Sequence, residues 1–70
     1  MSLDRQLNSH GHVHRFLVTN DPSSGWEVRE EEDAAVLRRT HRDDWHRVER
    51  DVRCFELTAL ALKREGWTEN

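Results

Sequence analysis

The apolar positions of the chain change their period near residue 43. From there to residue 65 they recur at spacings of three and four, the pattern of an amphipathic helix. We therefore expect one long helix over 43–65. The stripe that would pack on a core contains Trp45, Val48, Val52, Phe55, Ala59 and Leu62.

The predicted helix has recognisable start and stop signals. Thr40 or Asp43 suits the N-cap, and Lys63 and Arg64 suit the negative end of the helix dipole. Gly66 is expected at the C′ position, with Trp67 folding back on Leu62 as in a Schellman motif.

The segment before the helix has the shorter period of β-strands. We expect strands over 12–19, 26–31 and 34–40, with the turn cluster 20–25 between the first two. If Glu32 and Asp33 form a tight turn, Val28 faces Leu37 and Glu27 faces Arg38. The expected fold class is α+β, a three-stranded antiparallel β-meander followed by one long C-terminal amphipathic helix (βββα).

The expected domain organisation is simple. Residues 12–70 form a single small α+β domain, and residues 1–11 form a flexible N-terminal tail because they show little pattern. Leu17, Val28 and Leu37 suit the sheet face against the helix, which leaves Phe16, Val18 and Val36 on the other face.

The C-terminal half of the helix carries a second apolar surface. Cys54, Leu57 and Ala61 fall opposite the main stripe and Leu60 on its flank. A helix of 23 residues is about 34 Å long, so we expect it to overhang strands of about 23 Å. A core of 70 residues is marginal by itself. The four residues are therefore the expected homodimer interface.

Composition narrows the classes of function. The chain is 36% charged with a net charge of −3 and one cysteine, which excludes an intrachain disulfide and fits a reducing compartment such as the cytoplasm. Neither a signal sequence nor an apolar run long enough for a membrane span is visible. His41 and His46 lie beside Asp43 and Asp44 but without a nucleophile, so we expect a capping cluster rather than an enzyme, and no cofactor.

Three alternating histidines are a candidate metal site. His10, His12 and His14 would project from one face of an extended strand about 7 Å apart. Imidazole binds zinc, copper and nickel, but one straight strand cannot direct three rings at one ion without a further ligand such as Glu31. Ordinary exposed histidines are the simpler interpretation.

The expected sheet also carries ingredients of a nucleic-acid-binding surface. Arginines contact phosphates and aromatic rings stack on bases, and the candidates are Arg15, Trp26, Arg29, Arg38 and Arg39. Five acidic residues among them weaken a positive field and disfavour this function. We expect instead a small non-catalytic intracellular module, acting as a homodimer or with an unidentified protein partner. Nucleic-acid binding and metal binding are the alternatives.

Overall fold

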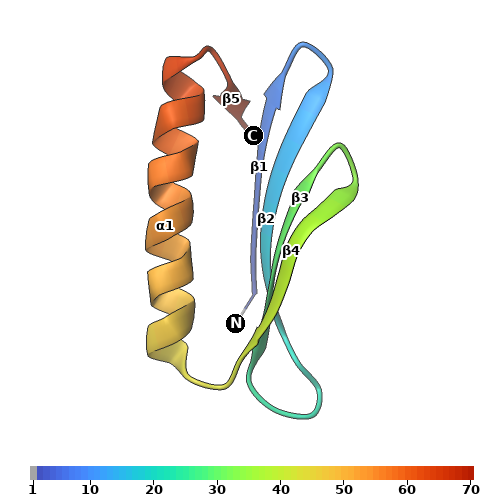
Figure 1. Ribbon diagram of the computed structural model, residues 1–70, viewed down its shortest axis with the longest axis vertical. Helices are drawn as coiled ribbons and strands as arrows, with labels where there is room; N and C mark the ends of the chain where they lie inside the picture. The colour runs from blue at the N-terminus through green and yellow to red at the C-terminus, as the bar shows by residue number, and fades with distance from the viewer. Residues whose placement is uncertain (1) are drawn as a thin grey trace.

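The protein is a five-stranded antiparallel sheet with one helix across a single face (Figure 1). The computed structural model describes residues 2–70. Its elements, in chain order, are β1 Leu3–Ser9, β2 His12–Asn20, β3 Trp26–Glu32, β4 Ala35–Arg42, α1 Trp45–Arg64 and β5 Thr68–Glu69. The spatial order of the strands is β4-β3-β2-β1-β5. The α+β class is confirmed, but the prediction of three strands is wrong, because four strands precede the helix.

The additional strand is β1, in the segment where a flexible tail was expected. Its register places Leu3, Arg5 and Leu7 on the helix side, and Leu7 is fully buried. A two-residue turn joins β1 to β2, and both of its residues, His10 and Gly11, have positive φ. Type I′ hairpin turns require this conformation. An arginine between the two leucines breaks the alternation that would have revealed the strand.

The core lies between α1 and one face of the sheet. The cross-strand rows Leu3–Val18–Val28 and Leu7–His14 contribute to this face. The face predicted for β2 is therefore inverted: Phe16 and Val18 point toward the helix. Leu17 points away, yet it is only 7% exposed. Its cross-strand neighbours there are Asp4 and Arg29, and an arginine stem can cover apolar surface.

The pairing of β3 with β4 differs from the prediction by three residues. Val28 lies opposite Thr40 instead of Leu37. The two-residue turn is Asp33–Ala34, one position later than expected, and a bulge between Glu30 and Glu31 adds the remaining residue. Side-chain contacts anchor this turn, because Asp33 accepts a hydrogen bond from the backbone N–H of Val13 at 2.8 Å.

The helix agrees most closely with its prediction. The N-cap is Asp44 instead of the predicted Thr40 or Asp43, and its side chain accepts a hydrogen bond from the backbone N–H of His46. At the other end, the N–H of Trp67 donates to the carbonyl of Leu62 and the N–H of Gly66 donates to Lys63, which is the expected Schellman pair. Within residues 2–70, no helix is both long and apolar enough to cross a membrane.

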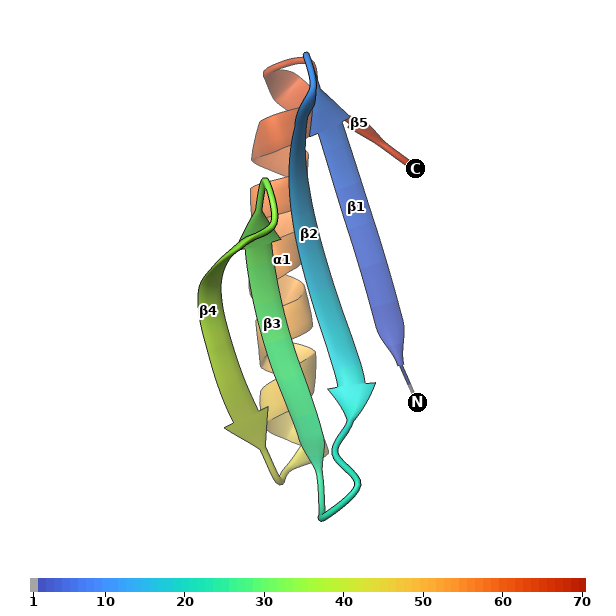
Figure 2. The same ribbon diagram turned by 90° about the vertical axis from the view of Figure 1, so that its right-hand side faces the viewer.

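The prediction that the helix overhangs its sheet is wrong. The β1–β2 hairpin rises beside its C-terminal half, and β5 returns along β1 (Figures 1 and 2). All six stripe residues consequently pack in or against the core along the whole helix. Strand β1, which the prediction omitted, extends the sheet beneath the C-terminal half of the helix.

Candidate interaction surface

The outward side of α1 carries the predicted apolar patch, defined here as Cys54, Leu57, Leu60 and Ala61. All four residues are exposed, with Leu57 at 71% and Leu60 at 49%. Cys54, the one cysteine of the sequence, has its side chain at the surface of the single chain. Leu57 is the more exposed of the two leucines in the patch.

Three members of the patch have the spacing of a helix-packing seam. Cys54, Leu57 and Ala61 are separated by three and four residues, the alternation that lets one helix pack on another. Continuing this spacing in both directions reaches Arg50 and Arg64, which are both exposed. The apolar seam therefore spans only about 10 Å, or two turns of helix.

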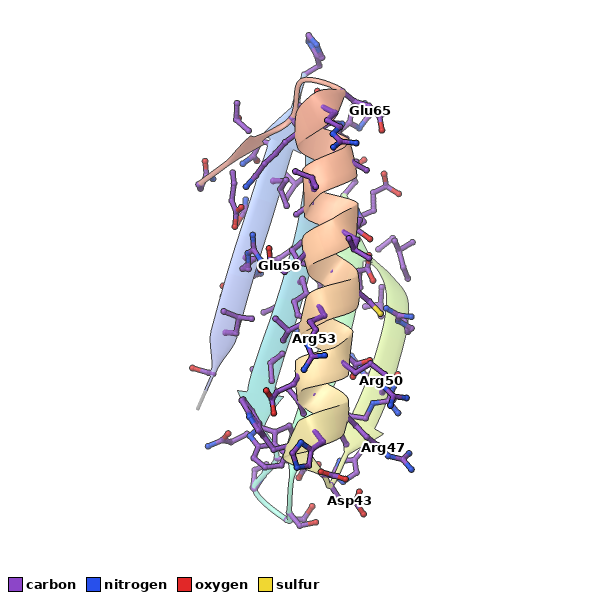
Figure 3. All side chains as sticks on the ribbon, turned by 90° about the vertical axis from the view of Figure 1, so that its left-hand side faces the viewer. Asp43, Arg47, Arg50, Arg53, Glu56 and Glu65 are labelled. Atoms are coloured by element: carbon purple, nitrogen blue, oxygen red, sulfur yellow. The ribbon has the colours of Figure 1, made fainter. Side chains whose placement is uncertain are left out.

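A row of arginines precedes the patch. Arg47, Arg50 and Arg53 project from the N-terminal half of α1 at intervals of three residues (Figure 3). None of them forms an ion pair with a carboxylate of residues 2–70. Two carboxylates four residues away from members of this row are engaged elsewhere: Asp51 binds Arg42, and Glu49 lies 3.6 Å from His46.

The arginines predicted to contact nucleic acid are distributed differently. Arg15, Arg29 and Arg39 lie on the sheet face opposite the helix, whereas Trp26 and Arg38 are in register with residues of the helix-facing side. Each arginine has a carboxylate partner: Asp4 for Arg15, Glu31 for Arg29, Glu30 for Arg38 and Glu27 for Arg39. Trp26 packs on Trp45, with ring centroids 5.1 Å apart. The fold does not gather these five residues on one surface.

The three N-terminal histidines have three separate environments. His10 is in the β1–β2 turn, and His12 binds the Asp33 carboxylate at 2.8 Å, which raises the pKa of the imidazole. His14 is buried, stacks near Phe55, and shares a 2.7 Å hydrogen bond with Glu30. Across the described residues, no group of three His, Cys, Asp or Glu side chains is arranged to hold a metal ion.

The histidines near the helix start are likewise engaged with carboxylates. His41 lies 3.1 Å from Asp21, and His46 lies close to Glu49. The His41–Asp21 contact links strand β4 to the turn before β3. The His46–Glu49 contact lies within the first turn of α1. Cys54 lies two turns further along the helix, where its backbone carbonyl accepts a hydrogen bond from the Thr58 hydroxyl.

A groove between α1 and the start of β1 is the feature that sequence reasoning missed. It has a volume of about 280 Å³. Its lining is mainly apolar, with Leu3, Val18, Trp45, Val48 and Val52, and it also includes Ser2, Glu49 and Arg53. Because β1 forms one wall, an interpretation that treats residues 1–11 as a tail cannot find it.

Comparison of the chain with protein-family models, with curated proteins and with solved structures gives no match. The surface of the chain is therefore the basis for inferring its function.

Proposed function

We propose that this protein is a small non-catalytic interaction module that self-associates through the apolar patch of α1. The supporting observation is Leu57, a large aliphatic side chain that is 71% exposed at the centre of a seam with helix-packing spacing. Burying this side chain against a second copy removes apolar surface from water, worth about 2 kcal/mol for each leucine. A chain of 70 residues gains proportionally more from this than a large domain does.

The arginines at both ends of the seam constrain the arrangement of two copies. In a closely aligned antiparallel pair centred on Leu57, Arg50 of one copy would lie beside Arg64 of the other. A crossing of about −50° makes contact over a short seam and separates the helix ends. We therefore expect two copies that cross at Leu57 and keep their arginines in solvent.

Sedimentation equilibrium tests the proposal directly. At about 100 µM we expect the mass of two 8.4 kDa chains, and Leu57→Glu should give the mass of one chain while its circular dichroism and cooperative unfolding persist. Leu37→Glu is the matched control, because Leu37 is 55% exposed but lies on β4. A single-chain mass for the parent protein, or equal effects of the two variants, would refute the proposed interface.

Salt dependence separates self-association from binding to an acidic partner. Each copy has a net charge of −3, so two copies repel each other as they approach. Higher salt screens this repulsion, and we expect tighter dimers in about 0.5 M NaCl than in 0.05 M. Binding of the arginine row to nucleic acid would weaken over the same range.

A further inference from the structure

The groove between α1 and β1 exists because three core-facing side chains are incompletely covered. Leu3, Trp45 and Val52 all pack against the hydrophobic core, yet each is only half-buried. They surround the 280 Å³ space, whose floor includes the buried Val18 and Val48. The groove is thus a gap in the core packing that opens to solvent, in contrast to the convex apolar patch of α1.

The volume and lining define the size and polarity of a suitable ligand. A dry apolar cavity of about 150 Å³ accepts one benzene ring, so a space of about 280 Å³ suits a ligand of roughly two fused rings or a branched chain of similar bulk. Small-molecule sites combine walls of this kind with a few polar groups that fix orientation. Here the polar lining residues are Ser2, Glu49 and Arg53.

Arg53 gives the groove a preference for negatively charged ligands. It lines the groove and forms no ion pair with any carboxylate in residues 2–70, so its guanidinium is available to a ligand. Glu49 also lines the groove, and its carboxylate lies 3.6 Å from the His46 ring. Guanidinium groups bind carboxylates through paired, charge-assisted hydrogen bonds.

From these observations we infer that the groove binds a compact apolar carboxylic acid, with its ring or branched body against Trp45 and Val52 and its carboxylate on Arg53. This site is separate from the self-association surface. Leu57 and Ala61 do not line the groove, so a failure of the dimer proposal leaves this inference intact.

Protein NMR with 2-naphthoate as the probe tests the site. Titration should shift the Val48 and Val52 methyl signals and the Trp45 indole N–H signal, with a Kd on the order of 0.1–1 mM. Two probes of the same size serve as comparisons: neutral 2-naphthylmethanol should bind about three- to tenfold more weakly, and cationic 2-naphthylmethylamine weaker still. Tighter binding of the amine would mean that Glu49 sets the charge preference of the groove, and would overturn the inference.

Two variants locate the charged and apolar halves of the site. Arg53→Gln should reduce the affinity for 2-naphthoate to that for the alcohol. Arg47 is also exposed but lies outside the groove, so Arg47→Gln should leave the affinity unchanged. Leu3→Phe should fill the groove and abolish the shifts while the protein stays folded. Undetectable binding at several millimolar, or shifts centred on Leu57, would reject the site.

Discussion

Arg5 of β1 and Glu69 of β5 form a two-point ion pair that joins the two ends of the chain. The Arg5 Nε lies 2.6 Å from Glu69 Oε2, and its Nη2 lies 2.8 Å from Oε1. The same guanidinium contacts Glu56 of α1 and stands over the Phe55 ring, 5.2 Å from its centroid. One side chain therefore holds β1, α1 and β5 together.

Because of this ion pair, we expect the fold to lose stability in acid. Hydrogen bonds from Arg5, and then from Lys63, lower the pKa of Glu69 from 4.5 to about 2. The unfolded chain binds the proton more tightly, so the pair stabilises the fold above pH 4.5 and its contribution disappears as the pH falls toward 2.

Glu69→Gln should therefore lower the free energy of unfolding by about 1 kcal/mol at pH 7, with a smaller difference near pH 2.5. The expected loss is modest because the Glu69 side chain is one-fifth exposed and water screens its charge. Urea unfolding at both pH values measures the effect. Glu65→Gln, an exposed carboxylate outside any ion pair of the described residues, is the control. A constant difference at both pH values would contradict the assignment.

Gly25 is expected to be the glycine least tolerant of substitution. A Cβ there would lie 2.3 Å from the backbone oxygen of Arg42, so the turn and the connection to α1 would have to separate. Gly66 also has positive φ, but a Cβ there would meet open space. We expect Gly66→Ala to cost about 1 kcal/mol for backbone strain alone, and Gly25→Ala at least about 2 kcal/mol. Thermal and urea unfolding compare the two, and equal losses would refute the clash.

Leu7 tests whether the N-terminal segment belongs to the fold. Its side chain is fully buried against the core, so Leu7→Ala should lower the free energy of unfolding by about 3 kcal/mol. Leu37→Ala, on the exposed side of β4, should change it by less than about 0.5 kcal/mol. Urea unfolding followed by circular dichroism distinguishes them. A Leu7→Ala variant as stable as Leu37→Ala would show that β1 contributes little.

The helix and its C-terminal end were determined by the sequence alone. The stripe from Trp45 to Leu62 and the Gly66–Trp67 stop are local signals, since their spacing and conformational preferences act within a few turns. The exposed Leu57 follows from the same periodicity, because a residue opposite the core stripe cannot face the core. These properties do not depend on which strands lie beneath the helix.

Only the tertiary structure decided the sheet. A strand gains stability from its neighbours, and β1 carries too weak an alternation to reveal itself before β2 and β5 pair with it. The Asp33–Ala34 turn is held by the contact of Asp33 with Val13 of β2, which is distant in sequence. The groove beside Arg53 likewise requires β1 and α1, which are distant in sequence, to form its two walls.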